Sequence, residues 1–111
     1  MRIGDFCEKY GLDRRSVSYW TDTGVLHPTR EEHGLAHWFD YGAECEEEAK
    51  KIVIARAMGQ SRVEKYMKLL DNLPSELWDM VVFEKIKEEM ENVTKQYRLA
   101  LEYAKELKTR S

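Results

Sequence analysis

Two adjacent arginines, Arg14 and Arg15, are the residues of this sequence best suited to contact another molecule. They fall in the first turn of a predicted helix, where positive charge opposes the helix dipole, so helix stability does not explain them. A guanidinium group can form paired hydrogen bonds with guanine O6 and N7 or with a phosphate. We therefore predict that both contact nucleic acid; the alternative is a solvated surface pair. Ser16 and Ser18 either hydrogen-bond to phosphates or bases or form an exposed polar face.

Residues of the types used in metal and catalytic sites lack the necessary spacing. His33, His37, Cys7 and Cys45 are zinc-ligating types, but the two histidines have a helical spacing within a predicted hairpin. The sequence thus predicts no metal site and no cofactor, and Cys7 is expected in the core. The acidic run Glu44–Glu48 is interpreted as a solvated helix start. Neither a catalytic triad pattern nor a Gly-rich phosphate loop occurs, which predicts that the protein is not an enzyme.

Length and charge restrict the class of protein. A chain of 111 residues predicts one domain, or one domain with an arm. Its 18 basic and 21 acidic residues give a net charge of −3, so a strongly basic nucleic-acid footprint is absent. The longest apolar runs fall far short of the roughly 20 residues of a membrane span, and the charged N-terminal segment predicts no signal peptide. Two widely separated cysteines favour a reducing, cytoplasmic location.

Local patterns predict a small helical domain carrying a hairpin. A short helix with Gly4 as its N-cap is expected to end at Gly11, and a second helix begins after Asp13 and stops at Gly24. Two short helices joined by a tight turn are typical of a helix-turn-helix. Short extended arms around Gly34, over residues 29–39, predict a hairpin that would form a wing. Two further helices follow, one capped by Asp40 and one by a capping box over residues 61–64.

The C-terminal third has the pattern of a coiled coil. Residues 76–108 contain no glycine or proline, and apolar residues recur at alternating intervals of three and four. Nothing earlier in the chain is long enough to cover such a helix, so the pattern predicts a homodimer. The expected dimerisation residues are Phe83, Ile86, Met90, Val93, Tyr97, Ala100, Ala104 and Leu107.

Several motifs occur in an order that resembles the MerR family of bacterial transcriptional regulators. They are Arg2-Ile3-Gly4, the segments 11–17 and 24–28, Tyr19-Trp20, Gly34 and Met58-Gly59. The resemblance covers residues 1–71, and residues 76–108 match the family's dimerising helix in kind. It implies a mainly α fold: a winged helix-turn-helix DNA-binding domain over residues 1–71 and a dimerisation helix over residues 72–111, paired as an antiparallel coiled coil. The implied partners are double-stranded DNA, a second copy of the chain, and RNA polymerase or another protein, with no membrane.

The resemblance also assigns roles to side chains. The second helix would enter the major groove, with Tyr19 touching the DNA backbone and Trp20 in the core. The wing would contact phosphates through Arg30, and Trp38 would pack the wing onto the following helix. The expected DNA-binding residues are Arg14, Arg15, Ser16, Ser18, Tyr19, Arg30, His33 and His37.

Two departures from the family pattern remove cations that would contact DNA. Ser18 stands where the family usually has arginine, and Leu35-Ala36 stand where the wing commonly has Tyr-Arg. Fewer phosphate contacts mean weaker and less salt-sensitive binding. Two functions therefore stay open: a DNA-binding transcriptional regulator, or a MerR-shaped interaction module, an adaptor or anti-regulator, with weak or lost DNA binding. An architectural role in bending DNA is a third. Because the sequence ends soon after the helix, at Ser111, we expect no effector domain and no small-molecule switch.

Overall fold

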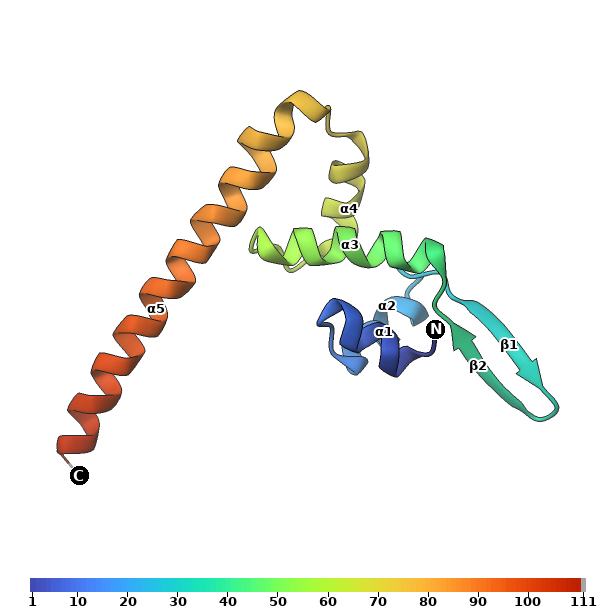
Figure 1. Ribbon diagram of the computed structural model, residues 1–111, viewed down its shortest axis with the longest axis horizontal. Helices are drawn as coiled ribbons and strands as arrows, with labels where there is room; N and C mark the ends of the chain where they lie inside the picture. Colours follow the sequence, from blue (N-terminus) through green and yellow to red (C-terminus); the bar gives the residue numbers. More distant parts are fainter. Residues whose placement is uncertain (111) are drawn as a thin grey trace.

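The computed structural model describes residues 1–110 and shows seven principal elements (Figure 1). The predicted mainly α winged helix-turn-helix with a long C-terminal helix is confirmed. In chain order the elements are α1 (Ile3–Tyr10), α2 (Arg14–Asp22), β1 (Thr29–His33), β2 (Ala36–Asp40), α3 (Ala43–Ala57), α4 (Val63–Asn72) and α5 (Glu84–Thr109). A 3₁₀ turn (Ser75–Leu77) and a π-helical turn (Asp79–Phe83) lie between α4 and α5.

Helix ends follow local chemistry in the first half of the chain. The side chain of Asp13 caps α2 by accepting a hydrogen bond of 2.9 Å from the N–H of Ser16, as the sequence predicts. Three other predicted caps are wrong. Helix α1 begins after Arg2, two residues earlier than a cap at Gly4 would place it, and has no side-chain cap. Helix α3 begins after Gly42, and Asp40 instead contacts the N-terminal amine of Met1 at 2.5 Å. Helix α4 begins after Arg62 without a side-chain cap, so the capping box does not form.

The main core lies among α1, α2 and α3. Burial of its apolar side chains supplies the driving force that holds these short helices together. Phe6 stacks on Tyr41 with ring centroids 4.8 Å apart, and the Tyr41 hydroxyl lies 3.0 Å from Thr21 Oγ1. The buried residues of this core are Phe6, Leu12, Val17, Trp20, Leu26, Tyr41, Cys45, Ala49, Ile52, Ala55 and Val63.

The acidic start of α3 is more than a solvated stretch. Glu46 accepts hydrogen bonds from Lys9 Nζ at 2.5 Å and from the Tyr10 hydroxyl at 2.8 Å, which joins α3 to α1. Those two donors lower the pKa of Glu46. Glu48 binds His27, in the loop after α2. The interpretation as solvated surface is therefore wrong for these two residues, because the fold brings donors to them from distant parts of the chain.

A second, smaller cluster joins α3 and α4 to the start of the long helix. Met58, Leu70 and Val82 are buried in it, and Trp78 and Ile86 pack against it. The α-helix expected from residue 76 begins only at Glu84, since a 3₁₀ turn and a π turn precede it. A π turn has i→i+5 hydrogen bonds, so the heptad phase does not continue unchanged through Phe83. Ile86 accordingly lies partly inside its own chain's cluster.

The wing lies at the N-terminal end of α3, whereas α5 starts beyond α4 and runs past the other end of α3 (Figure 1). The radius of gyration is 18.5 Å, whereas a compact domain of this length would have about 13 Å. Beyond its first turns α5 is an uncovered arm, with no buried residue and with Met90, Val93 and Tyr97 exposed by 63%, 50% and 69%. No helix in residues 1–110 is long and apolar enough to cross a membrane.

Candidate nucleic-acid interface

Helix α2 divides its side chains between the core and solvent. Val17 and Trp20 are buried, which confirms the core position expected for Trp20. Tyr19 is 61% exposed, although it is adjacent to Trp20 in sequence. Successive helical residues are about 100° apart, so neighbours point in different directions. The outward face of α2 carries Arg14, Arg15, Ser18 and Tyr19, and Ser16 is half-buried.

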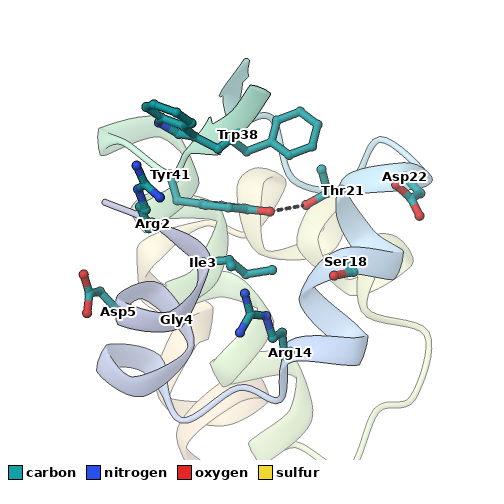
Figure 2. A pocket seen from close by; sticks show the side chains of 11 residues that line it. Arg2, Ile3, Gly4, Asp5, Arg14, Ser18, Thr21, Asp22, Trp38 and Tyr41 are labelled. Carbon is teal, nitrogen blue, oxygen red and sulfur yellow. Dashed lines mark hydrogen bonds between the residues drawn. The ribbon is translucent and has the colours of Figure 1, made fainter. Parts of the chain in front are cut away.

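Both α2 arginines are exposed, and within residues 1–110 neither forms an ion pair with a carboxylate. The side chains of Arg14 and Arg15 lie on different parts of the α2 surface. Arg14 and Ser18 line a cleft of about 450 Å³ bounded by α1, α2 and β2 (Figure 2), and Arg15 lies outside this cleft. The predicted DNA-binding residues of α2 are thus divided: Arg14 and Ser18 line the cleft beside the wing, and Arg15 does not.

The wall of the cleft opposite α2 is built around Trp38. The Arg2 guanidinium lies 4.2 Å from the centre of the Trp38 ring, and His33 stacks on the same residue with ring centroids 4.2 Å apart and planes at 4°. Trp38 therefore packs against Arg2 and His33, and the expectation that it packs the wing onto α3 is wrong. In the hairpin register Glu31 pairs with Trp38 and His33 with Ala36, so His33 and Trp38 are diagonal neighbours on one face.

Sequence reasoning did not include Arg2 among the binding residues. Arg2 and Trp38 stand at opposite ends of the winged domain's first 40 residues, and no local spacing connects them. A backbone hydrogen bond of 2.7 Å, from the N–H of Tyr41 to the carbonyl of Met1, brings the two segments together. The only available signal was the pairing of residue types, because arginine and tryptophan form the strongest cation–π contacts.

Carboxylates of the wing offset the positive charge of Arg30. Arg30 Nε lies 3.0 Å from Glu32 Oε1, and His33 Nε2 lies 3.8 Å from Glu31 Oε2. His37 pairs with Glu32 across the hairpin. The fully exposed Leu35 forms the tip of the hairpin together with Gly34. The wing candidates are therefore accessible, but carboxylates accompany each of them.

Metal-ligating side chains meet at a place that sequence analysis did not consider. Ligand atoms of His27, Glu44 and Glu48 lie within 4.8 Å of one another. Glu48 already uses both carboxylate oxygens, one 2.5 Å from His27 Nδ1 and one 3.1 Å from its backbone N–H. That contact raises the pKa of His27 and ties the loop after α2 to α3. Cys45 is buried, and burial raises the pKa of its thiol to about 11, which disfavours the reactive thiolate.

Comparison with known proteins agrees with this architecture. Residues 1–68, more than half of the chain, match the MerR HTH family of regulatory proteins. Comparisons with curated proteins and with solved structures gave no match. The matched region spans the helix-turn-helix, the wing and more than half of α4. The chain therefore belongs to the MerR HTH family of regulatory proteins.

Proposed function

We propose that this protein is a homodimeric transcriptional regulator that binds double-stranded DNA through α2 and the wing. The observation that carries the proposal is the outward face of α2, where two arginines stand without a carboxylate partner among the described residues. Unpaired guanidinium groups on one exposed helix are suited to phosphates and guanine edges. Arg15, with Tyr19 beside it, would contact the major groove. Arg14 and Ser18 would contact the backbone that runs toward the wing.

The uncovered apolar face of α5 supports the dimer. Met90, Val93 and Tyr97 are all at least half exposed, and they continue the heptad spacing along the arm. Pairing of this face with a second copy would remove it from water and place two α2 helices on one DNA duplex. Two half-sites read by one dimer multiply the affinity of each single contact.

Loss of the two α2 arginines provides the test. We expect Arg14→Ala/Arg15→Ala to weaken binding to the DNA upstream of the protein's own gene by about 100-fold or more, because one paired arginine–guanine contact is worth about 1–3 kcal/mol. Fluorescence anisotropy at about 50 and about 200 mM salt measures this, with random DNA alongside. The matched control, Arg62→Ala/Arg98→Ala, removes the same charge from exposed positions outside α2. Equal affinity of both variants would contradict the assignment.

The acidic character of the wing favours a second candidate function. Its two strands carry Arg30 against Glu31, Glu32 and Asp40, and Arg30 already contacts Glu32. Such a surface repels phosphates, so it is compatible with a dimeric interaction module, an adaptor or anti-regulator, that has weak or lost DNA binding. The same titration separates the two functions: wild-type binding no tighter to upstream DNA than to random DNA, even at low salt, would favour the module.

A further inference from the structure

The cleft between α1, α2 and the wing combines three features that suit an anion. Arg2 and Arg14 stand at its edges with Ile3 between them (Figure 2). Helix α1 begins without a side-chain cap, so no side chain of the described residues accepts from its first backbone N–H groups. Asp5 and Asp22 also line the cleft, but Figure 2 shows both side chains pointing away from its centre.

We propose that Arg2, which lies against the Trp38 ring, binds a phosphate of the DNA backbone at the mouth of this cleft. The inference rests on the proposed DNA-binding function and adds a contact that lies outside α2 and outside the wing tip. Trp38 is a positioning residue: the centre of its ring lies 4.2 Å from the guanidinium carbon of Arg2, and this contact restricts a long side chain that would otherwise sample many rotamers. His33 stacks on the same indole and fixes the ring itself.

Among the described residues, the N–H groups of Arg2 form no hydrogen bond with another side chain. The cation–π contact with Trp38 depends on the charge of the guanidinium, whereas a phosphate binds its N–H groups, so both contacts can form together. Within the described chain Arg2 has no carboxylate partner, in contrast to Arg30 in the wing. Arg2 is therefore the cation best placed to bind an anion at the base of the wing, although it is far from the wing in sequence.

The position of Arg2 across the cleft from α2 indicates what its phosphate contact would do. Arg14, on the α2 side of the cleft, and Arg2, on the wing side, would hold one DNA strand between them. A contact of this kind fixes how deeply α2 enters the groove and carries no base preference. It also offsets part of the charge lost through Ser18 and Ala36.

The test combines a protein variant with a neutralised phosphate. Operators are prepared in which one backbone phosphate at a time is replaced by an uncharged methylphosphonate, and each is titrated with wild type and Arg2→Ala. We expect Arg2→Ala to weaken binding about 10-fold on both upstream and random DNA, and to reduce the slope of log affinity against log salt by about one unit per protomer. One position in each half-site should weaken wild type but leave Arg2→Ala unaffected.

Further variants separate positioning from mere packing. Trp38→Phe keeps an aromatic face and should stay close to wild type, whereas Trp38→Leu should approach the affinity of Arg2→Ala. Thermal unfolding verifies that both variants are folded. Arg98→Ala is the matched control, since it removes one exposed cation on α5, outside the surface proposed to bind DNA.

Each outcome bears on the inference. If the wild type binds upstream DNA and Arg2→Ala loses no more affinity than Arg98→Ala, the phosphate contact is wrong and the DNA-binding function stands. A wild type without any DNA binding would overturn both. Stabilisation by inorganic phosphate that depends on Arg2, with no phosphate position sensitive to the variant, would indicate a small-anion site and would also overturn the proposal.

Discussion

At the residue scale, His27 shows how one side chain can fix the elements of the interface. It lies in the loop after α2, and Glu48 on α3 receives hydrogen bonds from both its ring and its backbone. Hydrogen bonding and charge attraction from Glu48, assisted by the charge of Glu44, raise the pKa of His27. The protonated imidazole is therefore favoured in the folded chain, and the position of α2 depends partly on that proton.

This contact should make stability depend on pH in a defined direction. A histidine whose pKa is raised by folding stabilises the native state below its unfolded pKa, about 6.5, and loses this effect as the pH rises through the higher folded value. We expect His27→Gln to lower the Tm clearly at about pH 6 and much less at about pH 9. Thermal unfolding by circular dichroism measures the difference, with His37→Gln as the control for loss of an exposed histidine. A Tm difference that is equal at both pH values would refute the coupling.

At the element scale, the turn between α3 and α4 determines how closely α5 can approach the domain. Gly59 lies in this turn with φ +78°, a conformation that side chains rarely adopt. A Cβ built there would come within 2.8 Å of the Glu89 carboxyl group on α5. Glu89 also lies 3.2 Å from Lys85, so the contact is with a flexible and already engaged side chain.

Substitution of Gly59 distinguishes two effects on stability: the strain of its left-handed backbone and the contact of an added Cβ with Glu89 on α5. Gly59→Ala should reduce the free energy of unfolding by about 1–2 kcal/mol through the left-handed conformation. Gly24→Ala is the matched control, because Gly24 has φ +79° and nothing within 4 Å of the position that a Cβ would occupy. Urea denaturation of both variants should show similar losses, with a modest excess at Gly59 as Glu89 shifts. A Gly59→Ala protein as stable as wild type would contradict the strain.

At the scale of the whole molecule, residues 1–110 form a small domain with an arm that no other part of these residues covers. The domain buries two apolar clusters, but α5 beyond Glu89 keeps its apolar stripe in water. Large exposed apolar surfaces in natural proteins are usually interfaces. A second copy supplies an identical stripe, so a symmetric pair is the economical way to cover both.

Charges placed in the stripe should prevent this pairing. Met90→Lys/Val93→Lys would bury charges in the dimer interface, so we expect monomers where the wild type forms dimers. Sedimentation equilibrium measures the mass directly. Glu91→Gln/Glu102→Gln changes the net charge by the same amount outside the stripe and should leave the dimer intact. Dimers of unchanged affinity in the lysine variant would refute the heptad interpretation.

Local sequence determined most of the elements and the direction of several side chains. The cap at Asp13, the hairpin around Gly34 and the inward position of Trp20 follow from interactions within a few residues, so they could be predicted. The uncovered stripe of α5 was also visible, since a heptad repeat is a local pattern. The motifs of residues 1–71 and their order were sufficient to indicate the MerR family.

Only the tertiary structure decided which charged groups are free and which are engaged. Glu46 and Glu48 acquire donors from α1 and from the loop after α2, Arg30 lies against Glu32, and Arg2 reaches Trp38 across the domain. These contacts join residues that are distant in sequence or lie on one face of a twisted hairpin. Periodicity records only which way a side chain points along its own element. The partner it meets depends on how the elements pack, and that is decided by the shared core.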